Sequence, residues 1–366
     1  MYKKLLLRLP LLLFIPVTYV LVLLASANPD FVERYYSNGF YKYVTHFNVF
    51  QYFPYASIAE IIFFVAIAAL VCFLVVFIVR LVRNKENRLA RILEVIQKAF
   101  IIFGIAYFLF YLSWGFNYSR LPYSDIADLP IQESSISELK QLSATLITRT
   151  NEARATLPSA EDGTLELPLT TAELQSITRD SYDKAVENSI PGISSNCSVP
   201  KAIAISPLLS YAGISGIYIP YTAESNYNND APMPLIGSSI CHELAHRQGF
   251  AREDEANFIS YLVCTNSQND YLNYSGLLLA VTHSMNKLHE RDRQSYNELY
   301  NLYSSEVIAD LEANRTYWNE RSGDIEEAVT NINDAYLKNN NLTDGVASYG
   351  RMVDLLLALQ RAERQY

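Results

Sequence analysis

Uncharged apolar runs dominate the first third of the chain. They cover residues 9–27, 61–79 and 99–116. As helices that rise about 1.5 Å per residue, runs of this length reach roughly 27–29 Å, close to the hydrocarbon thickness of a bilayer. The run at 61–79 has no polar face with which it would lie at the surface of a globular core. We therefore expect residues 1–116 to form a membrane anchor with three transmembrane helices.

The first apolar run also has features of a secretory signal peptide. Lys3, Lys4 and Arg8 precede it, and the small residues at 25–27 fit a cleavage site. The apolar segment of a signal peptide is normally shorter than this one, which favours an uncleaved anchor. Both interpretations place residue 28 outside the cytoplasm.

Residues 117–366 show the spacing of amphipathic helices instead of long apolar runs. Helices are predicted over about 135–154, 170–185, 236–248, 252–266, 275–302, 304–320, 322–338 and 344–364. Short β-branched segments at 202–206 and 216–221 are typical of strands, and Pro220 indicates that the second lies at a sheet edge. The expected fold class is mostly α, with three N-terminal transmembrane helices followed by a predominantly helical domain that contains a small β-sheet.

Charge divides the chain at the same boundary. Residues 1–116 contain 11 Lys and Arg against 5 Asp and Glu, a net charge of +6, whereas residues 117–366 contain 18 against 33, a net charge of −15. An acidic large domain argues against nucleic acid as a partner, because phosphate binding requires a basic face. Positive residues precede the first span and fill the 80–98 loop. The positive-inside rule therefore predicts a multi-pass protein of the cell membrane, with the lipid bilayer as partner, a cytoplasmic N-terminus and an extracytoplasmic large domain.

Residues 242–246 read His-Glu-Leu-Ala-His, the one motif that points directly to chemistry. On a helix, His242 and His246 share one face, where two imidazole nitrogens can bind one metal ion. Glu243 is rotated by about 100° from His242 and can reach a water molecule at the metal without ligating the metal. A zinc ion would acidify that water, and Glu243 would take its proton as general base. The sequence therefore predicts metal-assisted hydrolysis rather than a helix with two ordinary surface histidines.

A catalytic zinc ion needs a third protein ligand and an open position for water. The acidic cluster at 253–255 offers two candidates, Glu253 and Glu255. Glu253 is favoured, because Asn257 lies four residues later on the same helical face, where its amide can hydrogen-bond a ligand histidine. Ile259 occupies that position relative to Glu255 and offers no such contact.

The residues HELAH followed by EDEAN resemble the gluzincin metallopeptidases, whose glutamate ligand commonly sits in a Glu-x-x-Ala-Asp/Asn setting on the next helix. This resemblance implies a zincin-like domain, one zinc ion held by His242, His246 and Glu253, and peptide or protein substrates. Motifs along nearly the whole chain also resemble a family of bacterial membrane proteins expected to be zinc metallopeptidases. They are WGFNYSRLP at 114–122, GIYIPYTAESNYN at 216–228, HELAHRQGFAREDEANFISYL at 242–262 and SYGRMVDLLLAL at 348–359. A metzincin is excluded, since Arg252 stands where the third histidine ligand of that group would be.

Several further residues are candidates for supporting roles. The oxyanion of a hydrolytic transition state needs a hydrogen-bond donor, for which Tyr274, Tyr349 and Arg351 are candidates. The segment 216–221 is expected to hold an extended peptide by main-chain pairing. The remaining histidines of the large domain, His283 and His289, are expected at the helix surface.

The extracytoplasmic cysteines leave two interpretations open. They are Cys197, Cys241 and Cys264. Cys241 and Cys264 either form a disulfide between the two helices of the zinc site or remain buried thiols.

Two hypotheses about function follow. The first is a membrane-anchored zinc peptidase that acts outside the cytoplasmic membrane, and the second is a non-catalytic zinc-binding sensor or scaffold. Glu243 favours the first, because a purely structural site has no use for a general base beside an open metal position. Intramembrane proteolysis is excluded, since His242 lies about 126 residues beyond the last apolar run and has polar neighbours.

Overall fold

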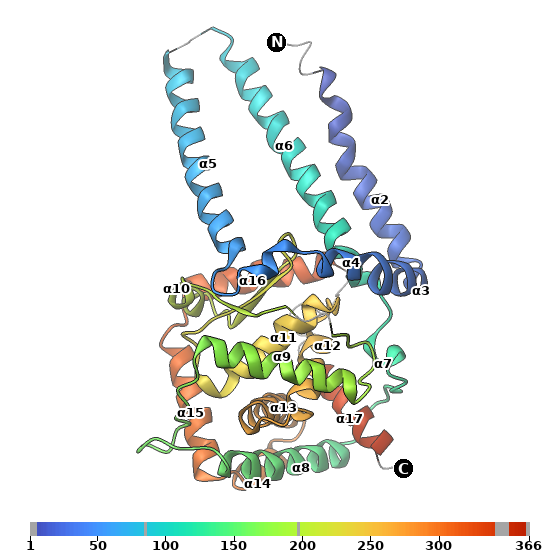
Figure 1. Ribbon diagram of the computed structural model, residues 1–366, viewed down its shortest axis with the longest axis vertical. Helices are drawn as coiled ribbons and strands as arrows, with labels where there is room; N and C mark the ends of the chain where they lie inside the picture. Colours follow the sequence, from blue (N-terminus) through green and yellow to red (C-terminus); the bar gives the residue numbers. More distant parts are fainter. Residues whose placement is uncertain (1–5, 84–85, 196–197, 341–350, 364–366) are drawn as a thin grey trace. The chain divides into compact units, whose positions relative to one another are not determined.

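The structure is a computed structural model that describes residues 6–83, 86–195, 198–340 and 351–363. Helices dominate these residues, and three short strands form a small sheet (Figure 1). The expected fold class, mostly α with three apolar N-terminal helices and a small sheet, is confirmed. Contacts between residues divide the chain into two units. Unit 1 comprises Met1–Phe50, Ser57–Arg120 and Ile219–Ala223, and unit 2 comprises Gln51–Ala56, Leu121–Tyr218 and Glu224–Tyr366.

Unit 1 is built from helices that include the three apolar runs. Its elements are η1 (Leu9–Leu13), α2 (Phe14–Ser26), α3 (Pro29–Phe31), η2 (Val32–Phe40), α4 (Tyr41–His46), the start of η3 (Val49–Tyr52), α5 (Ile58–Arg83), α6 (Arg88–Ser113) and η4 (Gly115–Ser119). Three stretches, Leu9–Ser26, Ile58–Arg83 and Arg88–Ser113, are long and apolar enough to cross a membrane.

The third apolar helix differs from the expected span at 99–116. It begins 11 residues earlier, at Arg88, because charged residues interrupt the hydropathy pattern without interrupting the helix. One of them, Glu94, pairs with Lys98 one turn later at 3.1 Å and with Arg8 at 3.0 Å. The helix ends at Ser113, since Trp114 leaves helical geometry with φ −160° and ψ −40°.

Unit 2 contains the other helices and the sheet. Its helices are α7 (Tyr123–Ile126), α8 (Ile136–Ala155), α9 (Thr171–Glu187), α10 (Ser206–Tyr211), α11 (Met233–Arg247), α12 (Glu253–Thr265), α13 (Asp270–Arg291), α14 (Arg293–Tyr300), α15 (Ser305–Asn319), α16 (Asp324–Asn339) and α17 (Met352–Glu363). Its strands are β1 (Lys201–Ala202), β2 (Gly216–Ile219, whose last residue is grouped with unit 1) and β3 (Glu224–Tyr227). The first long helices, α8 and α9, each start with a capping box, in which Ser135 pairs with Glu138 and Thr170 with Glu173.

Some of the expected elements of unit 2 are wrong in their bounds. The single helix expected over 275–302 is two helices, because Asp292 adopts extended geometry and its carboxylate accepts the Gln294 and Ser295 N–H groups that begin α14. The strand expected over 202–206 is only β1, since Ser206 already begins α10. Of the helix expected over 344–364, the structure has α17, while residues 341–350 lie outside the described residues.

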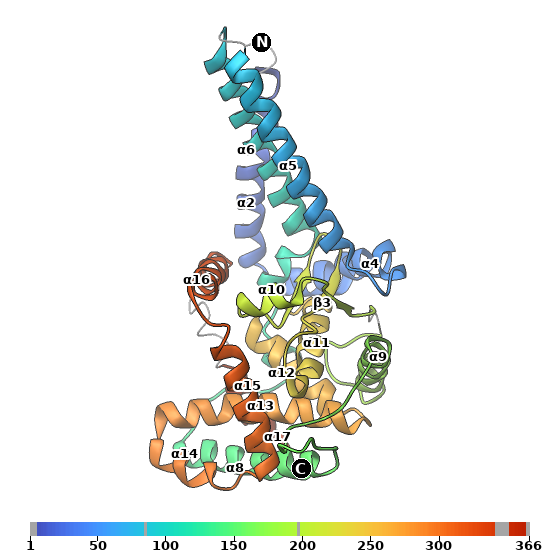
Figure 2. The same cartoon turned by 90° about the vertical axis from the view of Figure 1, so that its left-hand side faces the viewer.

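Helix α13 lies at the centre of the helical domain. Figures 1 and 2 show it between α8 on one side and α11 with α12 on the other, and it contacts all three. Its inner face includes Leu278 and Val281, which are fully buried, as is Ile240 of α11. Burial of each such aliphatic side chain is worth roughly 1.5–3 kcal/mol, so α11 is held on a rigid support.

The sheet has the order β1-β3-β2, with β1 parallel to β3 and Lys201 paired with Asn226. The central strand β3 packs on α11, where the Ser225 hydroxyl donates to the main-chain oxygen of Glu243 at 2.8 Å. Strand β2 is therefore an edge strand, as Pro220 indicates.

Candidate metal centre

Helix α11 carries the His-Glu-x-x-His motif on a well-packed scaffold. Leu244 and Ala245, the two residues between the motif's acidic residue and its second histidine, are buried in the core. The helix ends where Gly249 adopts the left-handed conformation with φ +89°. The Phe250 N–H then bonds back to the Ala245 oxygen at 3.2 Å, which turns the chain toward α12.

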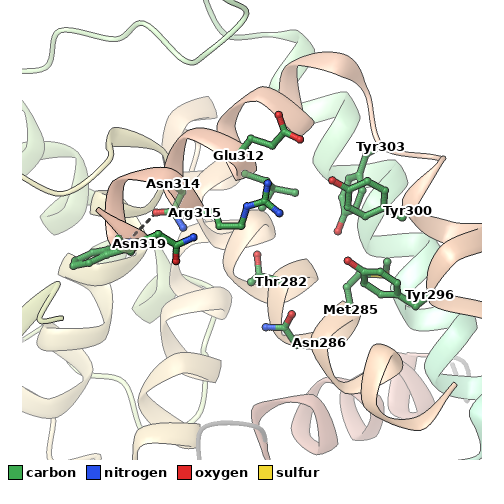
Figure 3. Close-up of a pocket in the computed structure, with 12 residues that line it drawn as sticks. Thr282, Met285, Asn286, Tyr296, Tyr300, Tyr303, Glu312, Asn314, Arg315 and Asn319 are labelled. Atoms are coloured by element: carbon green, nitrogen blue, oxygen red, sulfur yellow. Dashed lines mark hydrogen bonds between the residues drawn. The ribbon is translucent and has the colours of Figure 1, made fainter. Parts of the chain in front are cut away.

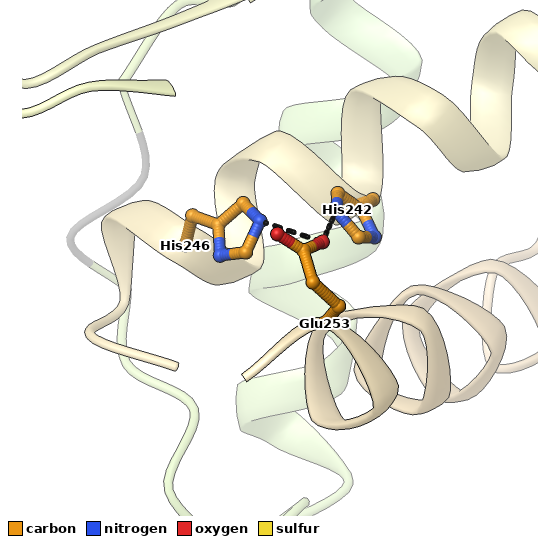
Figure 4. Close-up of side chains that lie close together, drawn as sticks. All are labelled: His242, His246 and Glu253. Carbon is orange, nitrogen blue, oxygen red and sulfur yellow. Dashed lines mark ion pairs between the residues drawn. The ribbon is translucent and has the colours of Figure 1, made fainter. Parts of the chain in front are cut away.

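The structure brings together His242, His246 and Glu253, with one ligand atom of each within 4.8 Å of the others (Figure 4). Oε2 of Glu253 lies 3.1 Å from Nε2 of His242 and 3.5 Å from Nε2 of His246. In a tetrahedral zinc site with ligand bonds of about 2.0–2.1 Å, ligand atoms lie roughly 3.3–3.5 Å apart. The donor set and the two distances to Glu253 are therefore compatible with a zinc ion.

Each histidine is oriented by a hydrogen bond at its other nitrogen. Nδ1 of His242 lies 2.8 Å from Oδ1 of Asn257, and Nδ1 of His246 lies 2.7 Å from the Phe250 main-chain oxygen. Both partners are acceptors, so each Nδ1 carries a proton, and each Nε2 is the atom that would bind a metal ion once it is deprotonated. The hydrogen bond expected between Asn257 and a ligand histidine is present.

Electrostatics couple the three residues strongly. Burial opposes the charged form of each group, but the attraction of His246 and the hydrogen bonds from both imidazoles hold the pKa of Glu253 below its usual range. In the same way burial would lower the pKa of His246, yet the nearby Glu253 carboxylate raises it to about 9. A proton on His246 thus balances Glu253 in the metal-free protein, and a bound metal ion would displace that proton.

Glu243 lies beside this triad and outside it. Its side chain is 5% exposed, and burial raises its pKa, an effect that the two histidines oppose. The carboxylate accepts the main-chain N–H of Tyr218, in strand β2. Its Oε2 atom has no hydrogen-bond partner in the described part of the chain. A buried carboxylate with one such oxygen can accept a proton from a water molecule at the triad.

Strand β2 approaches Glu243 closely because residue 216 is a glycine. A Cβ atom on Gly216 would lie 2.7 Å from both Cγ and Oε1 of Glu243. Main-chain groups alternate in direction along a strand, and Ser215 bonds toward β3 through Asn228. Gly216 and Tyr218 therefore direct their main-chain groups to the free edge of β2, where Glu243 lies.

The competing carboxylates of the acidic cluster lie elsewhere. Glu255 accepts the Tyr123 N–H and a guanidinium N–H of Arg252, both at 2.8 Å. Asp254 faces Arg351 at 3.6 Å, and burial raises its pKa to about 6. The structure thus places Glu253, and neither of the other two, against the histidines.

The expected oxyanion donors are not gathered at the triad. The Tyr274 hydroxyl donates to Asp310 at 2.6 Å inside the core, and Arg351 is directed to Asp254. Tyr349 lies outside the described residues. His289 is exposed, as expected.

His283 departs from the expectation of a surface residue. It is partly buried in α13, where burial and then the nearby His242 lower its pKa to about 4. A neutral imidazole therefore lies near the triad. Helical periodicity does not reveal it, because only the packing of α13 on α11 brings residues 242 and 283 together.

The two cysteines of the site helices are both buried thiols, and no disulfide joins Cys241 to Cys264. Close packing explains the burial of Cys264, since a Cβ on Gly276 of α13 would lie 2.4 Å from its Cβ. Cys197 lies outside the described residues.

Comparison with known proteins identifies the family. Residues 36–357 match the family described as "Protein of unknown function (DUF3810)", and the chain belongs to it. No curated protein and no solved structure matches the chain.

Proposed function

We propose that this member of the family is a membrane-anchored zinc peptidase, with His242, His246 and Glu253 as zinc ligands and Glu243 as general base. One observation carries the proposal: three ligand atoms converge within 4.8 Å beside a buried carboxylate that retains an oxygen without a partner. A site that only stabilised the fold would need the three ligands and a fourth, but would have no use for Glu243.

The residues of the site divide the work of hydrolysis. A zinc ion held by the triad would acidify an attacking water and polarise the substrate carbonyl. Glu243 would accept the proton of that water at Oε2, which has no hydrogen-bond partner in the described part of the chain, and would return it to the leaving amine. Asn257 and the Phe250 carbonyl hold the two imidazoles in the tautomer that can bind metal.

The edge strand β2 supports an extended peptide as the substrate. The outward main-chain groups of Gly216 can pair with a peptide strand laid along this edge. Such a peptide would place a carbonyl group near Glu243, because Tyr218 already donates its N–H to that carboxylate. The side chains around the triad remain accessible, since His242 is 13% exposed and Glu253 14% exposed.

We further propose a cytoplasmic N-terminus and an extracytoplasmic helical domain. Arg80 and Arg83 end α5, and Arg88 and Arg91 begin α6. The basic connection between these two helices supports a cytoplasmic location by the positive-inside rule.

Metal analysis combined with peptidase assays of the full-length protein in detergent tests the proposal. We expect one zinc ion per chain and cleavage of a peptide library by the wild type. Glu243→Gln should retain zinc and lose cleavage, whereas Glu253→Ala should lose zinc. Glu255→Gln is the matched control, since it alters a neighbouring carboxylate that does not face the histidines.

Each opposite result has a clear meaning. Full zinc retention in Glu253→Ala would reject the ligand set, and undiminished cleavage by Glu243→Gln would reject the general base. Stoichiometric zinc without cleavage of any peptide would instead support a non-catalytic zinc-binding scaffold.

A further inference from the structure

A second site-like feature lies in unit 2, on helices that carry neither the triad residues nor Glu243. Helices α13, α14 and α15 line an open groove with a volume of about 400 Å³ (Figure 3). This volume lies within the range of about 300–1,000 Å³ that small-ligand sites occupy. The groove is therefore large enough for a small ligand, and its lining decides which kind.

One wall of the groove is aromatic. The rings of Tyr296 and Tyr300 are 5.8 Å apart, and those of Tyr300 and Tyr303 are 5.7 Å apart. Tyr303 is only 8% exposed and anchors the series, while Tyr296 and Tyr300 remain partly exposed. Trp318 also lines the groove, and its indole N–H donates to Asn314 at 3.1 Å. Rings held in place before binding lose little conformational entropy when a ligand stacks on them.

Apart from Met285 and Leu311, the rest of the lining is polar. Figure 3 shows Arg315 reaching toward the tyrosines across the opening, with Thr282 and Asn286 on the α13 side. Within the described residues, the side chains of Asn286, Arg315 and Asn319 make no hydrogen bond to the protein. These amide and guanidinium groups are therefore available to a ligand.

The charge of the lining is balanced. It contains one basic residue, Arg315, and one acidic residue, Glu312, among its 12 members. A polyanion would be attracted by the first and repelled by the second. A purely apolar ligand would bury Asn286 and Arg315 without hydrogen-bond partners, at a cost of about 1–3 kcal/mol for the amide and more for the charged guanidinium. A neutral ligand with both apolar faces and hydrogen-bonding groups suits the lining best.

We propose that this groove binds a neutral oligosaccharide. A sugar ring presents an apolar C–H face that stacks on tyrosine or tryptophan, and its rim of hydroxyl groups both donates and accepts hydrogen bonds. The tyrosine wall and Trp318 supply the stacking surfaces, and Asn286, Arg315 and Glu312 supply planar polar groups for the hydroxyls. The site is independent of the proposed peptidase chemistry, since it shares no residue with the triad or Glu243.

Trp318 provides a reporter inside the groove. The chain has 2 tryptophans, and the other, Trp114, lies in unit 1 and is 5% exposed. In the full-length Trp114→Phe variant, trisaccharides of glucose and of N-acetylglucosamine are titrated while acrylamide quenching of Trp318 fluorescence is followed. At least one trisaccharide should protect Trp318 saturably. Saturation-transfer NMR of the wild type with the same sugars repeats the test without the tryptophan substitution.

Matched variants locate the binding. Tyr296→Ala should weaken saccharide binding by about 2–13-fold, since an aromatic contact is worth about 0.5–1.5 kcal/mol beyond its area. Arg315→Ala should weaken it by roughly tenfold or more, since a hydrogen bond to a charged group is worth about 1.5–3 kcal/mol. Arg179→Ala, an exposed arginine of α9 outside the groove, should leave binding unchanged. Glu243→Gln should also bind normally, which separates this site from the peptidase. Equal affinity in Arg315→Ala and wild type, the absence of protection by either sugar, or protection by peptides in place of sugars would overturn the proposal.

Discussion

Replacing Gly216 with alanine adds a methyl group at the place where the Glu243 carboxylate now lies. The new Cβ would be 2.7 Å from Cγ and Oε1 of Glu243 and 3.0 Å from its Cδ. Ordinary contacts of this kind span 3.4–4 Å, so the carboxylate or the strand has to move by about 1 Å. The backbone of Gly216 is not left-handed, so alanine adds no conformational strain and the effect is steric.

A displacement of about 1 Å at a catalytic group can reduce the rate about 100-fold, equivalent to about 2.7 kcal/mol of transition-state stabilisation. We therefore expect kcat/KM for peptide cleavage to fall by that factor in Gly216→Ala. Zinc content should stay at one ion per chain, because the added methyl group meets Glu243 and none of the three ligands. The assay compares cleavage rates and zinc content of the purified variant with those of the wild type.

Gly323→Ala is the matched control for this variant. A Cβ at Gly323 meets nothing within 4 Å, so cleavage and zinc content should both remain unchanged. Wild-type cleavage by zinc-loaded Gly216→Ala would refute the role of this glycine in positioning Glu243. Loss of zinc from Gly216→Ala would equally refute the reasoning, because it would mean that the ligands and not the base had moved.

Three further predictions concern the supports of the site and the fold. Asn257→Ala removes the acceptor for Nδ1 of His242, so zinc affinity should fall by about 10–100-fold when it is measured by chelator competition. The control variant Asn266→Ala, at the end of the same helix, should leave zinc affinity unchanged. Asp310→Ala leaves the buried Arg154 guanidinium and the Tyr274 hydroxyl without their shared partner. The free energy of unfolding, measured by denaturant titration, should therefore fall by about 3–5 kcal/mol. A variant as stable as the wild type would contradict the buried pairing. The hydrogen bond from Arg361, followed by those from Ser135, lowers the pKa of Glu138 to about 2 from an ordinary 4.5. The ionised carboxylate therefore stabilises the fold above pH 4.5, and this contribution is lost as the pH falls toward 2. The melting temperature of Glu138→Gln should therefore lie below that of the wild type at neutral pH and converge with it near pH 2, and a constant difference would contradict the assignment.

Local patterns in the sequence predicted the parts of the protein that depend on neighbouring residues. The apolar runs identified three helices, and the spacing of Glu253 and Asn257 on one helical face correctly anticipated the hydrogen bond to His242. The break at Asp292 was missed, because the apolar spacing continues through it and only the capping geometry of the aspartate reveals two helices.

The rest of the site depends on contacts between distant segments. The approach of Gly216 to Glu243 joins residues 27 positions apart through the packing of the sheet on α11, which no local pattern specifies. The same holds for His283, which reaches the neighbourhood of His242 through α13. The groove tyrosines could not be distinguished beforehand among the 27 tyrosines of the chain.

The central claim is that His242, His246 and Glu253 hold a zinc ion for which Glu243 is the base. Its most direct test is the side-by-side measurement of bound zinc and peptide cleavage in the wild type and Glu243→Gln, both as full-length protein. The account predicts one zinc ion per chain in both proteins and cleavage by the wild type alone. Absence of zinc from the wild type, or equal cleavage by the two proteins, would contradict it.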